Sequence, residues 1–491
     1  MVKIAVIGSG FAGLSAASRL AQQGYDVTII EKNKLPGGRA RQFSEKGFVF
    51  DMGPSWYWMP DVFEKYFGLF GKKVSDYYTL DRLDPSYRVY FGKDDYWDVP
   101  ANFETLKKQF DNLEPGAGAE LEKFMKESAY KYEVGINDLV YKPSRSLTEF
   151  MDARLLNGLL KMDVFSSITS YVKKHFKHPK IIELLEFPVL FLGAKPSKTP
   201  ALYSLMNYAD IKLGTWYPQG GMFKIIEGMV SLAKELGVKF ELGNGVQKIK
   251  TKNGKATQLI LENGEFDADI IVGGADYHHV EQHLLDQKDR NYTNQYWDNR
   301  VMAPSSLIFY LGIDKKLEGL EHHNLFFDQP FTKHAEEIYD DPQWPTNPLF
   351  YVSCPSKTDK TVAPEGKENI FILVPVAPNL KDTEDIREKY FDMVMDRLEE
   401  HTKQKIKDAV IYKRSYAHKD FISDYNAFKG NAYGLANTLK QTAILKPSLK
   451  SKKVKNLYFT GQLTVPGPGV PPSLISGQVV AKEIQKDLKL A

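Results

Sequence analysis

The chain has 491 residues, 43% of them hydrophobic, and a formal net charge of +3. This length supplies core for two or three domains, and the charge is too small to indicate a nucleic-acid partner. The single cysteine, Cys354, excludes an internal disulfide and a metal site built from several cysteines, and it fits a reducing compartment. No apolar run approaches the roughly 18 residues that a membrane span needs, and we expect no cleaved signal sequence.

The start of the chain, up to Glu31, has the pattern of a strand, a glycine-rich turn, a helix and a second strand. Residues 3–7 are typical of a buried parallel strand, and Gly8, Gly10 and Gly13 follow with the spacing G-x-G-x-x-G. Gly8 permits the tight turn, Gly10 lets a pyrophosphate approach the backbone, and Gly13 lets the helix pack closely on the sheet. The free N–H groups and the dipole of the helix start then favour an anion. The pattern predicts a dinucleotide site rather than a glycine turn without a ligand.

Acidic and basic residues near this turn fit the same ligand. Glu31 ends the second strand, where its carboxylate can accept hydrogen bonds from a ribose diol and disfavours a 2′-phosphate. Gly37 and Gly38 have no side chains, so the backbone can pass close to the nucleotide. Arg39 offers a fork of donors suited to pyrophosphate, and a surface salt bridge is the alternative.

A cluster of large side chains follows a predicted strand over residues 48–51. The turn Gly53-Pro54-Ser55 leads directly into Trp56, Tyr57, Trp58 and Met59. Four large side chains in a row on a turn are not expected to be all exposed to solvent. They either line an apolar cavity or cap the core, and the sequence leaves both interpretations open.

A second set of strands is predicted from two distant parts of the chain. Residues 77–100 alternate between aromatic and polar side chains, as antiparallel strands do, and residues 307–313 and 370–375 are strongly β in character. We expect these strands to form one sheet in a second domain. Residues 390–401 and 403–409 are expected to be helical.

Residues 150–213 combine apolar and basic segments within a mostly helical stretch. Apolar residues recur at helical spacing over 155–165, basic residues cluster over 173–180, and residues 181–192 are again strongly apolar. A face lying on an anionic bilayer is one interpretation. A buried helix pair with solvated lysines is the other.

The chain then returns to the nucleotide-binding unit. A helix over 223–236 and strands over 238–242 and 246–250 are predicted, with Asn253-Gly254 as a hairpin turn and a buried strand near 270–273. Near the C-terminus, a strand ending at Gly461 precedes a glycine- and proline-rich run and a helix expected over 474–488. The free N–H groups of that helix can face a second negative group, and in a flavoenzyme this would be the flavin N1–C2=O edge.

These motifs resemble the bacterial carotenoid desaturases of the phytoene desaturase type, within the flavin amine oxidase and carotene desaturase group. The resemblance runs end to end and also includes residues 217–221, 363–366 and 456–476. It implies non-covalent FAD and an α/β fold, in which a discontinuous Rossmann-like FAD-binding domain carries an inserted mixed-sheet substrate domain and a helical, membrane-facing subdomain. The expected ranges are 1–76, 214–285 and 446–491 for the FAD-binding domain, 77–102 and 286–445 for the substrate domain, and 103–213 for the helical insert.

The resemblance also assigns residues to the cofactor. Its FAD-contacting positions are Gly8, Gly10, Phe11, Ala12, Gly13, Glu31, Lys32, Gly38, Arg39, Gly53, Pro54, Ser55, Val246, Gly461, Gly469 and Val470. One departure is Thr464-Val465-Pro466, where such enzymes often have Thr-His-Pro, so that histidine cannot be required here. No match for a catalytic acid or base is found in the helical insert, and the catalytic residues stay unknown. The adjacent pairs His278-His279 and His322-His323 lack metal-ligand spacing and are interpreted as structural or exposed, and no metal site is predicted.

The implied reaction is the introduction of double bonds into phytoene, to lycopene or an intermediate, by hydride transfer to flavin N5. Because a hydrocarbon has no polar group that the protein could bind, a tunnel lined by aromatic and aliphatic side chains is expected. The candidate wall residues are Trp56, Tyr57, Trp58, Phe187, Leu190 and Phe191. The expected partners are the hydrophobic carotenoid, a membrane surface and oxygen or a quinone as electron acceptor. The expected location is cytoplasmic, peripherally associated with the inner face of the cell membrane.

Several alternatives stay open. The enzyme could act on a hydroxylated carotenoid, as a 1-hydroxycarotenoid 3,4-desaturase does, or on a C30 squalene-type chain. An amine oxidase is a second class, although no motif marks an amine site. Outside enzymes, a prenyl-binding protein of the Rab escort and GDP-dissociation-inhibitor type shares this fold. The intact glycine motif with Glu31 and Arg39 argues against that last class.

Overall fold

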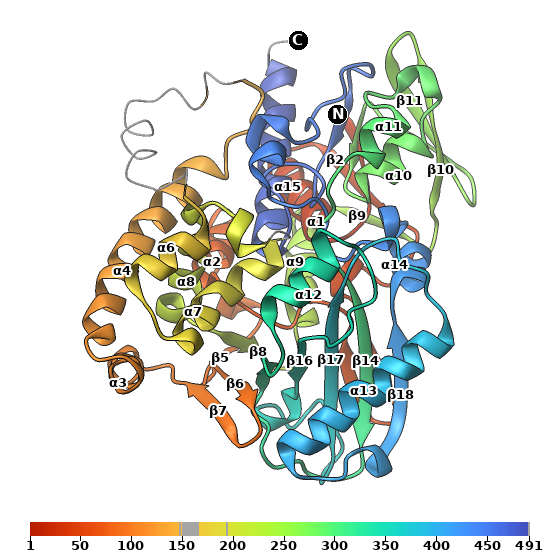
Figure 1. Cartoon of the computed structure of the whole chain (residues 1–491). Helices are drawn as coiled ribbons and strands as arrows, with labels where there is room; N and C mark the ends of the chain where they lie inside the picture. Colours follow the sequence, from red (N-terminus) through yellow and green to blue (C-terminus); the bar gives the residue numbers. More distant parts are fainter. Residues whose placement is uncertain (147–148, 150–165, 193–194, 490–491) are drawn as a thin grey trace.

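The computed structural model describes residues 1–146, 149, 166–192 and 195–489. Its helical insert, coloured orange to yellow in Figure 1, lies to one side of the molecule. The seven-stranded sheet and helix α13 lie at the bottom of the same view, and both termini lie at the top. Helices α1 and α15 lie between these regions, near the centre.

A five-stranded parallel sheet carries the glycine-rich turn. Its strand order is β19-β13-β1-β2-β9, and every neighbouring pair is parallel. The strands come from three separate parts of the chain, as the predicted discontinuous nucleotide-binding unit requires. Their bounds are β1 (Lys3–Ile7), β2 (Asp26–Glu31), β9 (Lys239–Leu242), β13 (Ile270–Gly273) and β19 (Leu457–Phe459).

Two helices from opposite ends of the chain pack closely against each other beside this sheet. They are α1 (Phe11–Gln22) and α15 (Val470–Lys489). Ser15 Oγ donates to the Leu474 carbonyl at 2.7 Å, and a Cβ on Gly477 would lie 2.4 Å from the Ala12 carbonyl oxygen. Only small residues permit this approach, which explains the run of glycine, alanine and serine in α1. Helix α15 begins at Val470, earlier than the predicted start at Leu474, because prolines suit the first turn of a helix.

A seven-stranded mixed sheet forms the second layer, in the order β18-β14-β17-β16-β15-β6-β7. The parallel pair β6–β15 joins the strands from residues 87–99 to those from residues 305–416, as predicted. The first strand of the predicted 77–100 set is an exception, because residues 80–82 pair with residues 216–218 in a separate two-stranded sheet. The bounds are β6 (Tyr87–Gly92), β7 (Asp95–Val99), β14 (Ser305–Ile313), β15 (His323–Phe326), β16 (Phe350–Ser353), β17 (Glu368–Val376) and β18 (Val410–Tyr416).

The two faces of this sheet have different neighbours. Leu307, Phe309 and Ile372 on one face pack with Val394 and Leu398 of α13 (Glu384–Thr402), which crosses the sheet in Figure 1. The residues that alternate with them point to the opposite face, toward the main core. The helix predicted over 403–409 is wrong: Lys403 has a positive φ of 56° that ends α13, and only residues 407–409 form a short 3₁₀ turn.

The helical insert contains α3 (Phe103–Leu113), α4 (Ala117–Tyr132), α6 (Ile168–His175), α7 (Pro179–Glu186) and α8 (Leu205–Asn207). Ile181, Leu184 and Leu185 of α7 are fully buried, as the interpretation of a buried helix pair requires. Lys173 and Lys174 are exposed at the end of α6. The apolar residues 155–160 and 164–165 lie outside the described residues. In the part of the chain that the structure describes, no helix is long and apolar enough to cross a membrane.

Shorter elements complete the fold. Asn253 and Gly254, both with positive φ, form the predicted hairpin turn between β10 and β11. The remaining strands and helices are β3 (Gln42–Glu45), β4 (Phe48–Asp51), β5 (Leu80–Arg82), β8 (Trp216–Pro218), β10 (Val246–Lys252), β11 (Lys255–Leu261), β12 (Glu265–Asp267), α2 (Pro60–Gly68), α9 (Phe223–Glu235), α10 (Tyr277–Gln282), α11 (Asn294–Asp298), α12 (Phe331–Tyr339) and α14 (His418–Tyr425).

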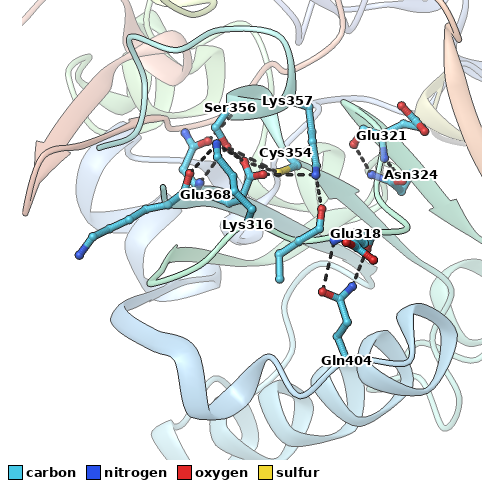
Figure 2. A network of polar contacts seen from close by, with 12 residues as sticks. Lys316, Glu318, Glu321, Asn324, Cys354, Ser356, Lys357, Glu368 and Gln404 are labelled. Atoms are coloured by element: carbon cyan, nitrogen blue, oxygen red, sulfur yellow. Dashed lines mark hydrogen bonds and ion pairs between the residues drawn. The ribbon is translucent and has the colours of Figure 1, made fainter. Parts of the chain in front are cut away.

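Cys354 lies in a buried polar network at the start of β17, shown in Figure 2. Its Sγ is 3.6 Å from both Ser356 Oγ and Glu368 Oε2, and Glu368 forms ion pairs with Lys357 at 3.2 Å and Lys316 at 3.6 Å. Burial, reinforced by the neighbouring Glu368 carboxylate, raises the pKa of the Cys354 thiol well above its usual range. The thiolate that reacts with most reagents is therefore strongly disfavoured.

We expect Cys354 to react with a thiol reagent at least about 100-fold more slowly in the native protein than in urea, because reaction needs local opening of this network. The measurement is the rate of absorbance increase with an aromatic disulfide reagent. Equal rates in the native and the urea-unfolded protein would contradict the buried placement of Cys354.

Candidate active site

A cavity of about 690 Å³ lies where the two sheets meet. It is lined by the carboxyl ends of β1 and β2 on one side and by β14, β16 and β17 of the seven-stranded sheet on the other. All the residues predicted to contact the cofactor line this cavity except Gly13. The carboxyl edge of a parallel sheet is where open α/β folds bind ligands.

The glycine-rich turn has the geometry that each glycine was predicted to provide. Gly8 adopts a φ of +96°, which only glycine tolerates without strain. A Cβ on Gly13 would lie 2.0 Å from the Gly8 carbonyl oxygen, so Gly13 is required for close packing between helix and turn. A Cβ on Gly10 would meet no atom within 4 Å, because this residue faces the cavity. No side chain caps the N-terminus of α1, which leaves its N–H groups available to an anion.

Glu31 is buried beside this turn and holds it in place. Its Oε2 accepts hydrogen bonds from the Ser9 backbone N–H at 2.9 Å and the Ser9 hydroxyl at 2.8 Å. Its Oε1 accepts two more from Asn33, both at 2.9 Å. The ribose contact stays a prediction, and the structure adds a second role: the carboxylate ties the end of β2 to the phosphate-binding turn.

Arg39 places a buried positive charge on the cavity wall. Its Nη2 donates to the Asn431 carbonyl at 3.3 Å, its Nε has no protein partner, and the guanidinium lies 5.3 Å from the Tyr425 ring centroid. Burial lowers the pKa of Arg39, opposed by the nearby Asp276 carboxylate, whose own pKa burial raises to about 6. A buried guanidinium with unused donors fits a diphosphate better than the alternative of a surface salt bridge.

The C-terminal segment closes the other side of the cavity. Gly461, which follows β19, and Gly469, which precedes α15, have φ values of +111° and +110°. These two turns bring the first residues of α15 to the cavity wall, where Val470 and Ser473 contribute to the lining. The cavity therefore meets the N-termini of two helices, α1 and α15, as the sequence predicted.

The remaining wall is apolar and comes from the seven-stranded sheet. Ile308, Leu373 and Tyr351 lie side by side on β14, β17 and β16, because Ile308 pairs with Leu373 and Leu373 pairs with Tyr351 across the strands. All three line the cavity, together with Met59 and Met206. This row forms a largely apolar floor that suits a hydrophobic ligand.

The predicted wall residues differ in where the structure places them. Trp56 and Trp58 line the cavity. Tyr57 is not among the lining residues: it stacks on Phe63 at 4.6 Å and its hydroxyl contacts that of Tyr78 at 3.0 Å. Phe187 packs behind the wall, 5.8 Å from Trp56 and 6.0 Å from Trp58. The side chains of Leu190 and Phe191 lie outside the described part of the chain.

Sequence reasoning missed most of the floor. Ser306, Ile308, Tyr351, Leu373 and Tyr433 all line the cavity, yet they lie far along the chain from the glycine motif. Each occurs in a segment whose sequence indicates only a buried strand or a loop. The period-2 pattern of β14 and β17 marks two faces, but both faces are buried, so it cannot tell which one meets the ligand.

Comparison with known proteins identifies the family. The family model described as "Flavin containing amine oxidoreductase" matches residues 11–485. The chain belongs to this family. An oxidoreductase from Methanosarcina mazei has the same fold, with a TM-score of 0.63 and 19% identity over 98% of this chain and 100% of that one.

Several relatives that match nearly the whole chain are carotenoid desaturases. A carotenoid 3,4-desaturase of Haloarcula japonica is 40% identical over 486 residues, which cover 99% of this chain and 98% of that protein. A zeta-carotene-forming phytoene desaturase of Myxococcus xanthus is 32% identical and covers 98% and 93% of the two chains. A 4,4'-diapophytoene desaturase of Staphylococcus haemolyticus is 33% identical and covers 99% of both. The family and these relatives indicate FAD as the cofactor, and the buried Arg39, the open side of Gly10 and the two helix N-termini fit its diphosphate and flavin.

Proposed function

We propose that the protein is an FAD-dependent desaturase that introduces double bonds into phytoene, giving lycopene or an intermediate. The observation that carries this proposal is the continuity of one cavity from the phosphate-binding turn to the apolar floor of Ile308, Leu373 and Tyr351. A dinucleotide cofactor and an apolar ligand can therefore share one cavity. Full-length relatives that desaturate carotenoids support the same assignment.

The residues of the chain would bind the cofactor, orient the substrate and exclude water from the site. The N–H groups at the start of α1 and the Arg39 guanidinium would hold the diphosphate, and the start of α15 would lie at the flavin end. When bound, FAD accepts the hydride that leaves one carbon of the substrate. The apolar floor and Trp56 position the carbon chain and keep water out. The other hydrogen must leave the neighbouring carbon as a proton.

A second candidate substrate is a hydroxylated carotenoid. The relative with 40% identity is named for the 3,4-desaturation of a carotenoid. Ser55, Ser306 and Tyr433 place hydroxyl groups in the otherwise apolar part of the cavity. These groups could bind a hydroxyl on the substrate. A C30 chain is a third candidate substrate, because another relative is named as a 4,4'-diapophytoene desaturase.

We also propose that the helical insert rests on an anionic membrane surface, from which a water-insoluble substrate can enter. The exposed side chains of Lys173, Lys174 and Lys177 support this proposal. Each basic residue near such a surface contributes about 1 kcal/mol of attraction. His175 is not part of this surface, because its side chain is buried and its Nδ1 lies 2.6 Å from Glu120. Oxygen or a membrane quinone would reoxidise the cofactor.

Product analysis tests the function. The purified, FAD-loaded protein is mixed with liposomes that contain phytoene, a 1-hydroxycarotenoid or a C30 diapophytoene in parallel reactions. We expect phytoene to be converted to polyenes with longer conjugation. Chromatography and absorption spectra measure this conversion. Conversion of the hydroxylated carotenoid alone would instead assign the 3,4-desaturase activity. No conversion of any carotenoid by the FAD-loaded protein would contradict the proposed function.

A further inference from the structure

Two adjacent histidines lie directly behind the apolar floor of the cavity, at the start of β15. The His323 ring is fully buried and stacks on Trp56, with ring centroids 4.2 Å apart and planes inclined by 11°. Its Nδ1 lies 2.6 Å from the Tyr351 hydroxyl. Trp56 and Tyr351 both line the cavity, so His323 is separated from the ligand space by one layer of side chains.

Tyr351 is the polar member of the row that forms the cavity floor. Its neighbours in that row, Ile308 and Leu373, have no polar side-chain atoms, whereas its hydroxyl interacts with His323, Ser55 and Ser353. Because a buried hydroxyl is stable only when it is hydrogen-bonded, this cluster fixes the position of the Tyr351 oxygen. The residues come from β15, β16 and the turn at residues 53–55, so the tertiary fold alone assembles them.

The electrostatic environment keeps His323 neutral. Burial, with a smaller contribution from the neighbouring His322, lowers the pKa of His323 well below its usual value. Burial also lowers the pKa of His322 to about 3, although Asp359 opposes this shift. Both imidazoles are therefore free bases at ordinary pH. When Nδ1 of a neutral His323 carries no proton, the Tyr351 hydroxyl donates to it.

A route leads from His323 to the surface. The rings of His323 and His322 have centroids 4.4 Å apart, and His322 Nδ1 lies 2.9 Å from the hydroxyl of Thr358, which is exposed. A small cavity of about 20 Å³, lined in part by Ser55, Ser353 and His322, lies beside this pair. Such a volume with polar walls has room for one water molecule. The Nε2 atoms of both histidines have no protein partner, and His322 itself lines this small cavity.

We propose that Tyr351 and His323 form the proton acceptor of the desaturation, with His322 and Thr358 as the exit to solvent. The inference rests on the proposed function. As the hydride leaves one substrate carbon for FAD, positive charge develops in the carbon chain. The C–H bond on the neighbouring carbon then breaks: its electron pair forms the new double bond, and its proton passes to the Tyr351 oxygen. Tyr351 gives its own proton to His323 Nδ1, and the proton leaves through His322.

The weak basicity of the pair is sufficient for this step. A C–H bond next to a carbocation is very strongly acidic, so a neutral imidazole with a lowered pKa still accepts its proton readily. The lowered pKa has a further consequence, because it prevents His323 from being protonated by solvent beforehand. A positioned acid–base group of this kind typically contributes about 10²- to 10⁴-fold to a rate.

The test uses Tyr351→Phe in the FAD-loaded protein, since phenylalanine keeps the ring in the floor. We expect this variant to bind FAD, as measured by flavin absorbance, and the carotenoid as well as the wild type does. Its turnover should fall about 100-fold. Deuterium on the carbon that loses the proton should slow this variant more than the wild type, because proton removal becomes rate-limiting. Tyr390→Phe, which removes a hydroxyl donating to the Pro345 carbonyl on the opposite side of the sheet, is the matched control.

A second variant separates the proton relay from a structural role. His323→Gln should slow turnover, and the double variant Tyr351→Phe/His323→Gln should be no slower than Tyr351→Phe alone, since the histidine acts only through the tyrosine. Normal turnover and an unchanged isotope effect in Tyr351→Phe would overturn the relay while leaving the proposed function intact. Additive losses in the double variant would also overturn it. Inactivity of the wild-type protein on all three carotenoids would overturn the proposed function and the relay together.

Discussion

Gly10→Val should abolish FAD binding and leave the fold intact. A Cβ at this position would meet no atom within 4 Å, and the φ of −72° is accessible to any residue. The open space around Gly10 is part of the cavity, where the diphosphate must approach the backbone. A branched side chain would occupy that space, so we expect FAD affinity to fall about 100-fold or more, a loss of roughly 3 kcal/mol. Flavin absorbance after gel filtration and titration of the apoprotein with FAD measure the effect.

Two further glycines make this experiment specific. Gly92→Val is the matched control, because a Cβ there also meets no atom within 4 Å and the residue ends strand β6, away from the cavity lining. It should keep full FAD binding. Gly13→Ala should instead destabilise the protein, because its Cβ would lie 2.0 Å from the Gly8 carbonyl oxygen. Full flavin content in Gly10→Val would remove the basis of the cofactor assignment.

The nucleotide half of the site could be predicted because its geometry is local. The backbone conformation of Gly8, the close packing of Gly13 and the position of Glu31 all follow from one continuous unit, in which β1, α1 and β2 succeed each other directly. Glycine is demanded there by sterics that act between near neighbours in sequence. The predicted strands of the second sheet were found for a similar reason, since alternation and β-branched content are local properties.

The substrate half could not be predicted in the same way. Tyr57 lies between two residues that line the cavity but points into the core instead, because neighbouring side chains on an extended segment face opposite directions. The side-chain contact between His323 and Tyr351 depends on the register between β15 and β16, in which His323 pairs with Ser353. Helix α12 separates these two strands along the chain. Adjacent histidines therefore looked structural in the sequence, and only the sheet register places one of them against the cavity wall.

Lys446 is a buried base close to the loop that leads into α15. Its side chain is almost fully buried, its Nζ donates to Asn437 Oδ1 at 2.8 Å, and the same atom lies 2.5 Å from where a Cβ on Gly467 would be. Burial lowers the pKa of Lys446 from the ordinary value of 10.5 to about 7. In the unfolded chain the group keeps its ordinary pKa. Between about pH 7 and 10.5 the unfolded state therefore binds more protons than the folded state.

Because of this difference, Lys446 lowers the free energy of unfolding, and this loss becomes smaller as the pH rises. The full loss, well below pH 7, is about 5 kcal/mol, and it falls to about 4 kcal/mol at pH 7 and about 2 kcal/mol by pH 9. Lys446→Met removes it but leaves the Asn437 amide oxygen without its donor, which costs about 1–3 kcal/mol. We therefore expect the variant to be roughly 2 kcal/mol more stable than the wild type at pH 7, with this advantage lost by pH 9.

Urea unfolding of both proteins at pH 7, 8 and 9 measures this difference, because the other titrating groups are common to both and cancel. The exposed Lys440→Met is the control and should leave the dependence of stability on pH unchanged. A constant difference between Lys446→Met and the wild type across this range would show that Lys446 keeps its ordinary pKa in the folded protein. A difference that vanishes with rising pH would show that the pKa of Lys446 is lowered in the folded protein.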